Sequence, residues 1–160
     1  MQLSSHLLGQ LERVPRSVDE RNEYAPCRVR LRSGEVLDRV YMVEASTARN
    51  GWGHVKNTVA LEDIVQIEES PLRLPAKWAD ELYLAPESGM GYRHFALQIN
   101  DGSLLHFVVG NLVDFPNWPP GIGPENVIGV VTGPDREVFR HRAPGPYESG
   151  ATFLWCTYES

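Results

Sequence analysis

Two histidines and a nearby carboxylate are the residues best placed for acid–base or metal chemistry in this sequence. His94 and His106 lie on either side of Asp101-Gly102, a dipeptide that favours a tight hairpin turn. If the two arms pair, the imidazoles approach each other, and Asp114 or Glu87 would have to supply the carboxylate of a proton-transfer site. His94, His106 and Asp114 are therefore the candidates for a catalytic role. The favoured interpretation is that both histidines lie on an exposed strand face.

The sequence has no recognisable metal or cofactor motif. No two of its five histidines have the spacing of a helical zinc site, and Cys27 and Cys156 are far apart. Phosphate-binding loops, dinucleotide fingerprints and nucleophile elbows are also missing. We therefore predict no metal and no cofactor, and two buried, reduced thiols. Enzymatic activity is left uncertain, leaning towards none.

Aromatic residues occur in segments that read as loops, rich in glycine, proline and asparagine. Exposed aromatic side chains often anchor protein interfaces, because they bury a large area at low entropic cost. The predicted binding surface consists of Trp52, His54, Tyr92, Phe115 and Trp118. The alternative is that these rings fold back and cover the ends of a sheet.

Arg28, Arg30 and Arg32 alternate with apolar residues, as on a half-buried strand with one basic face. Such a row is usually solvated or paired with acids of a neighbouring strand, but it could also hold single-stranded nucleic acid. The chain has 15 basic and 21 acidic residues, for a net charge of −6. Phosphate binding needs a basic footprint, so this balance disfavours nucleic acid as a partner.

The elements that must position these residues centre on a predicted hairpin over residues 94–109. Phe95, Leu97 and Ile99 alternate with other residues before the turn, and a β-prone run follows it. A similar pattern surrounds Ser33-Gly34. The leucines and valine of residues 3–14 fall on one face of a helix, which predicts a short N-terminal helix.

The two hairpin patterns align when Gly34 is placed on Gly102, at an offset of 68 residues. Residues 62–67 resemble residues 125–130 at an offset of 63. Each copy then consists of a strand, a tight turn, a strand, a variable loop and a further strand. We interpret this as a duplicated antiparallel unit, with chance similarity between hairpins as the alternative.

The first copy resembles the strand pattern of Sm-like and SH3-like small β-barrels over residues 27–68, and residues 95–131 resemble it more loosely. Residues 27–68 contain neither the Asn-Asp nor the Arg-Gly signature of the RNA-binding Sm-like proteins, so no RNA-binding residue is carried over. The resemblance implies a strongly bent sheet and oligomerisation through sheet edges. The matching residues are Val29, Leu31, Gly34, Val36, Val40, Leu61, Ile64 and Ile67.

We predict a mostly β chain in which two related antiparallel units form a bent, barrel-like core, with an N-terminal and a connecting helix. The domain prediction is one compact domain over residues 1–160. It is made of β units at about 24–70 and 92–133, a connecting helix at about 74–85 and a C-terminal strand at about 151–158. Strands are also expected at 58–61 and 64–67, and a long exposed loop at 134–150.

The predicted function is non-catalytic binding or adaptor activity in the cytoplasm, through the aromatic loops, with a protein partner or a second copy of the chain. No secretory signal or membrane span is visible in the sequence. The alternatives are a small-molecule binder or enzyme with a pocket between the two units, and a single-stranded nucleic-acid binder.

Overall fold

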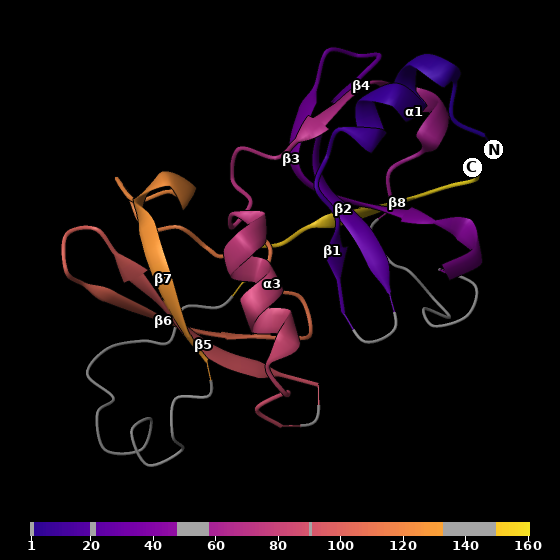
Figure 1. Ribbon diagram of the computed structural model, residues 1–160. Coiled ribbons are helices and arrows are strands. Elements are labelled where there is room, and N and C mark those ends of the chain that lie inside the picture. Colours follow the sequence, from indigo (N-terminus) through magenta and orange to yellow (C-terminus); the bar gives the residue numbers. More distant parts are fainter. Residues whose placement is uncertain (1, 20–21, 48–57, 90, 133–149) are drawn as a thin grey trace. The chain divides into compact units, whose positions relative to one another are not determined.

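The computed structural model describes residues 2–19, 22–47, 58–89, 91–132 and 150–160. Strands predominate over helices and form two bent sheets (Figure 1). The predicted mostly β fold class is confirmed, but no closed barrel forms in the described part of the chain. The elements are α1 (Ser5–Glu12), β1 (Ser17–Val18), β2 (Glu23–Leu31), β3 (Val36–Glu44), η1 (Leu61–Asp63), β4 (Ile64–Glu69), α3 (Ala76–Leu84), β5 (Arg93–Ile99), β6 (Leu104–Val109), η2 (Pro124–Asn126), β7 (Val127–Thr132) and β8 (Leu154–Tyr158).

The chain divides into two compact units. Unit 1 consists of Met1–Arg73 and Thr152–Ser160, and unit 2 of Leu74–Ala151. The C-terminal strand therefore belongs with the N-terminal part of the sequence. That residues 1–160 form a single domain stays a prediction.

Unit 1 is a five-stranded sheet built on β2. Strands β1, β3 and β4 all pair antiparallel with β2, and β8 pairs with β3 in parallel (Figure 1). In the parallel pair, Val40 lies opposite Leu154 and Met42 opposite Cys156. A parallel neighbour needs a long connection. Here that connection contains β4 and the whole of unit 2, which separates β4 from β8 in sequence.

The core of unit 1 lies between one face of the sheet and α1. Leu11 and Val14 pack with inward-facing strand residues such as Val29 and Val40. Burying one such aliphatic side chain stabilises the fold by about 1.5–3 kcal/mol. The Ser4 hydroxyl accepts a hydrogen bond from the Leu7 amide at 3.3 Å and so caps the helix. The predicted N-terminal helix is confirmed.

Unit 2 is a three-stranded antiparallel sheet with β5 at its centre, between β6 and β7. Its interior contains the stacked rings of Phe95 and Phe107, whose centroids are 5.4 Å apart. The connecting helix predicted at 74–85 is α3, which begins after Pro75 and contributes buried Leu82 and Tyr83. The Arg93 guanidinium is buried and donates hydrogen bonds to the carbonyls of Leu82 and Ala85, at the end of α3.

The two units repeat one strand arrangement in the same register. In unit 1, Val29 lies opposite Leu37 on β3 and opposite Ile67 on β4. In unit 2, Leu97 lies opposite Leu105 on β6 and opposite Val130 on β7. The first two residues of each set are related by the 68-residue offset, and the third by the 63-residue offset. The third strand also carries a register shift at the same place, between Arg30 and Leu31 and between Gln98 and Ile99.

The turns of the two hairpins have the same geometry. Gly34 has φ = 92° and Gly102 has φ = 89°, a left-handed conformation that side chains with a Cβ adopt at a cost. The Gly34 amide donates to the Leu31 carbonyl at 2.8 Å, and the Gly102 amide donates to the Ile99 carbonyl at 2.9 Å. The Ser-Gly and Asp-Gly dipeptides therefore predicted these reversals correctly.

Two details differ from the expectations, and a third prediction is not tested. Residues 58–61 do not form a strand: Thr58 makes one bridge to Trp155, and Leu61 already begins the short helix η1. A register shift between Cys27 and Val29 occurs in unit 1 and has no counterpart in the β5–β6 pair. Apart from Gly150, the loop expected at 134–150 lies outside the described residues.

Candidate interaction surfaces

The structure places the predicted aromatic residues in different environments. Tyr92 is half-buried, and its ring lies 5.1 Å from that of His94. Trp118 is half-buried, whereas Phe115 is only 3 % exposed. Phe115 therefore belongs to the interior of unit 2, and its ring does not contribute exposed surface. The other two members of the predicted surface, Trp52 and His54, lie outside the described residues.

The two candidate histidines lie on the same face of the unit 2 sheet, on neighbouring strands. They are not directly opposite each other. His94 lies opposite Val108, and His106 lies opposite Ala96. Residues directly opposite each other, and those two positions apart along one strand, face the same side of a sheet. The hairpin thus brings both imidazoles to one face at diagonal positions, where Cβ atoms are typically about 7 Å apart.

Asp114 is fully buried and has a different partner. Its Oδ2 accepts a hydrogen bond from the Tyr83 hydroxyl at 2.5 Å, and the same hydroxyl oxygen accepts one from the Val113 amide at 3.0 Å. The Arg93 guanidinium lies 5.6 Å from the centre of the Tyr83 ring. These contacts join the segment around Asp114 to α3, which is a structural role. In the described residues, no group of three or more histidine, cysteine or acidic side chains is arranged to hold a metal ion.

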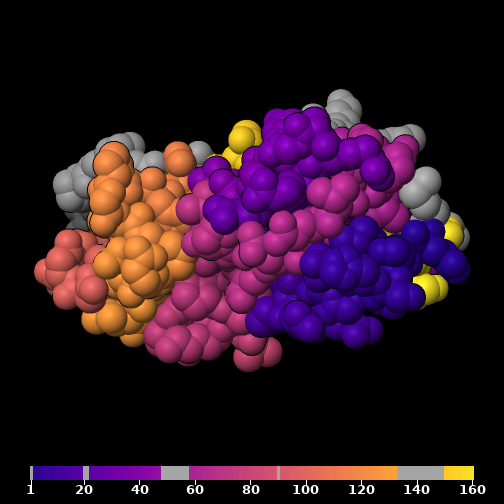
Figure 2. All heavy atoms as spheres, turned by 90° about the horizontal axis from the view of Figure 1, so that it is seen from above, coloured from indigo at the N-terminus to yellow at the C-terminus, as the bar shows by residue number. Residues whose placement is uncertain are grey.

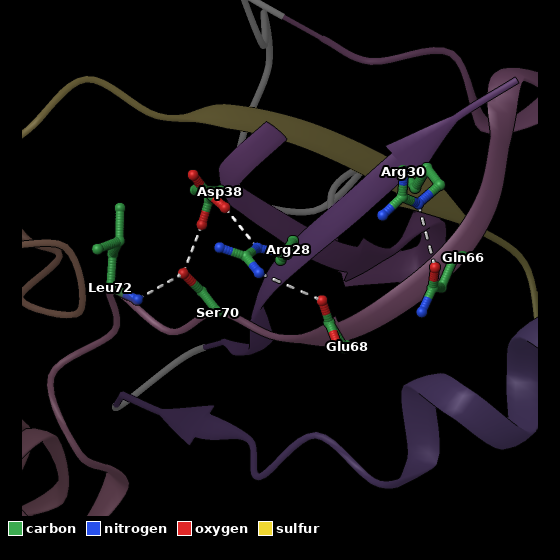
Figure 3. Close-up of polar contacts among 7 residues, drawn as sticks. All are labelled: Arg28, Arg30, Asp38, Gln66, Glu68, Ser70 and Leu72. Atoms are coloured by element: carbon green, nitrogen blue, oxygen red, sulfur yellow. Dashed lines mark hydrogen bonds and ion pairs between the residues drawn. The ribbon is translucent and has the colours of Figure 1, made fainter. Parts of the chain in front are cut away.

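The outer face of the unit 1 sheet is a network of paired charges (Figure 3). Arg28 lies between two acids, with its Nε 2.5 Å from Asp38 Oδ1 and its Nη1 3.6 Å from Glu68 Oε1. Arg30 Nε donates to the Gln66 side chain at 3.3 Å. The charge of Arg28 is therefore neutralised by neighbouring strands, as expected for a structural row of arginines.

The third arginine and the end of β4 extend the same face. Arg32 Nη2 donates to the Glu62 carbonyl at 3.2 Å. The Ser70 hydroxyl donates to the Asp38 carbonyl and accepts a hydrogen bond from the Leu72 amide at 3.1 Å (Figure 3). All three arginines of the row thus contact groups of the protein itself.

Both cysteines are buried within the core of unit 1. Burial raises the pKa of Cys27 to about 12, and the same cause raises the pKa of Cys156 to about 12. A thiol is nucleophilic as its thiolate, so both side chains are chemically quiet in the folded chain.

Exposed apolar side chains on the strands form a surface feature that was not predicted from the sequence. Six large apolar side chains are well exposed in the described residues, and four of them form two equivalent pairs. Val36 and Val65 of unit 1 correspond to Leu104 and Ile128 of unit 2 under the two offsets. The alignment of the repeats contains this correspondence, but sequence alone does not show which side chains remain uncovered.

A cluster of aromatic rings on strands was also missed. Tyr41 of β3 is fully buried, and its ring makes edge contacts with Tyr24 and Phe153 at centroid distances of 5.4 and 4.9 Å. Trp155 of β8 lies 4.9 Å from Tyr41 as well. Tyr41 and Trp155 are direct neighbours in the parallel strand pair. These rings therefore help to hold the C-terminal strand on the sheet.

None of the described helices has the length and apolar character needed to cross a membrane. The chain matches no protein-family model, no curated protein and no solved structure. Its function must therefore be inferred from its own residues.

Proposed function

We propose that this chain is a non-catalytic binding or adaptor protein of the cytoplasm that acts on a protein partner. The observation that supports this proposal is the exposure of apolar side chains at the same two positions of both units. The charged side chains around Arg28, in contrast, pair with one another within the sheet. Apolar side chains left in water at defined positions are typical of protein interaction sites.

Two of the described aromatic residues are further candidates for contact with a partner. Tyr92 and Trp118 are half-buried, so each ring can pack on its own unit and still present an edge to a partner. Neither the alternative of a catalytic pocket nor that of nucleic-acid binding has comparable support. Asp114 is engaged by Tyr83, and Arg28 is engaged by Asp38 and Glu68.

The test is affinity capture with the immobilised full chain from a native lysate, followed by mass spectrometry. We expect a protein partner that is retained by the wild type and lost from a Tyr92→Ala/Trp118→Ala variant. Leu84→Ala is the matched control, because Leu84 is 87 % exposed on α3 and is not part of the proposed surface. Thermal unfolding of each variant establishes that it is folded.

If the wild type and both variants capture the same proteins, or if the wild type captures no protein, binding through these aromatic residues is refuted. The partner could also be a second copy of the chain. Light scattering of the purified chain tests this, since self-association would appear as a concentration-dependent dimer.

A further inference from the structure

The two exposed aliphatic residues of unit 2 flank one position of the central strand. Leu104 of β6 and Gly129 of β7 both lie opposite Gln98. Because the register between β5 and β7 shifts at this point, β7 contains one extra residue, Ile128, directly before Gly129. Leu104 is 50 % exposed and Ile128 is 60 % exposed. We call Leu104, Gln98 and Ile128 the hairpin-end patch. Figure 2 shows the segment around the β5–β6 turn and that of β7 adjacent on one surface of unit 2.

The sequence segment that contains the hairpin-end patch carries charge of one sign. From His94 to Thr132 the sequence contains no lysine or arginine, and its acids are Asp101, Asp114 and Glu125. Asp101 and Glu125 are exposed, whereas Asp114 is buried. The hydrogen bond from the Asn100 amide to the Asn126 carbonyl, at 2.9 Å, holds the two exposed acids at the same end of the sheet.

The equivalent corner of unit 1 carries charged residues of both signs. Val36 and Val65 are 38 % and 39 % exposed there. Arg30 occupies the position that corresponds to Gln98, and Arg32 follows two residues later, just after the end of β2. Isolated exposed aliphatic residues are ordinary on protein surfaces. The unit 2 corner is distinguished by a larger and more exposed pair, in a sequence segment that has no lysine or arginine.

We propose that the hairpin-end patch binds a segment of a partner protein in which aliphatic residues are flanked by lysine or arginine. The aliphatic side chains would cover Leu104 and Ile128, and the basic groups would pair with Asp101 and Glu125. Complementary charge of this kind selects a partner and speeds its association, while the apolar contact supplies most of the affinity. The inference rests on the proposed function and names the chemistry of the partner.

The test uses the full chain and two short synthetic peptides, one with aliphatic residues flanked by lysines and one with glutamates in their place. Calorimetry at about 0.1 M salt measures binding under moderate screening. We expect the lysine peptide to bind and the glutamate peptide not to bind. A Leu104→Ser/Ile128→Ser variant should bind the lysine peptide at least about tenfold more weakly.

The matched control is Val18→Ser/Leu84→Ser, which removes two exposed apolar side chains outside these equivalent pairs and should leave the affinity unchanged. Equal losses in both variants, or no loss in either, would mean that the peptide responds only to the net charge of −6 and would overturn the proposal. Absence of binding by the wild type would overturn it as well.

The capture experiment separates this inference from the proposed function. If a captured partner is still retained by the folded Leu104→Ser/Ile128→Ser variant, binding activity stands and the hairpin-end patch is not its site. If no partner is captured and the lysine peptide does not bind, both proposals fail.

Discussion

Replacing Tyr83 by phenylalanine should destabilise unit 2 by removing a single hydroxyl group. That hydroxyl donates to Asp114 at 2.5 Å and accepts from the Val113 amide at 3.0 Å. Both partners are buried, with Val113 1 % exposed and Asp114 0 %. Phenylalanine keeps the ring and its packing but leaves two buried polar groups without this partner. Each such group costs ~1–3 kcal/mol, so we expect a loss of about 2–6 kcal/mol in the free energy of unfolding.

Urea denaturation followed by circular dichroism measures this loss as a lower midpoint with an unchanged slope. Tyr92→Phe is the matched control, because it deletes the hydroxyl of a half-buried tyrosine in the same unit. We expect that control to change the free energy of unfolding by less than about 0.5 kcal/mol. If Tyr83→Phe is as mild as the control, the hydroxyl does not hold the segment around Asp114 to α3, and the structural role assigned to this contact is wrong.

Two further predictions concern the turns and the thiols. Gly34→Ala and Gly102→Ala should each destabilise by about 1–2 kcal/mol, since both positions have positive φ. Gly9→Ala should instead stabilise the protein by about 0.5–1 kcal/mol, because Gly9 is inside α1 and an added Cβ would have open space around it. Thermal melts measure the three changes in stability, and the same sign at all three positions would contradict this reasoning. Cys27 and Cys156 should resist alkylation at pH 8 in the folded chain and react fully in denaturant, because burial raises both pKa values to about 12; rapid labelling of the native chain would contradict it.

The repeat gives the strongest link between sequence and structure in this protein. The offset of 68 residues between Gly34 and Gly102 correctly related the strand pairs, the turn hydrogen bonds and the glycine conformations of the two units. These features depend on neighbours close in sequence and on strict alternation along each strand, so a local pattern contains them. That the two units arose by duplication of one ancestral unit remains our interpretation of this agreement.

The candidate sites were harder to predict from the sequence, because the exposure of a side chain depends on which other parts of the chain cover it. Phe115 reads as an exposed loop aromatic among prolines but is buried in unit 2. For Arg28, pairing with acids of a neighbouring strand was expected, but the sequence does not show which acids; they are Asp38 of β3 and Glu68 of β4. For Arg28, the deciding neighbours are brought together only by the strand pairing.

The amino-acid sequence by itself determined the local elements: the β-rich class, the two glycine turns, the N-terminal and connecting helices, and the strand at the C-terminus. Periodicity and turn chemistry act over a few residues, which is why these elements could be predicted. Only the tertiary structure decided that β8 returns to unit 1 as a parallel neighbour of β3, and that Leu104 and Ile128 remain exposed beside Gln98. Those outcomes depend on contacts between residues distant in sequence, and no local pattern specifies them.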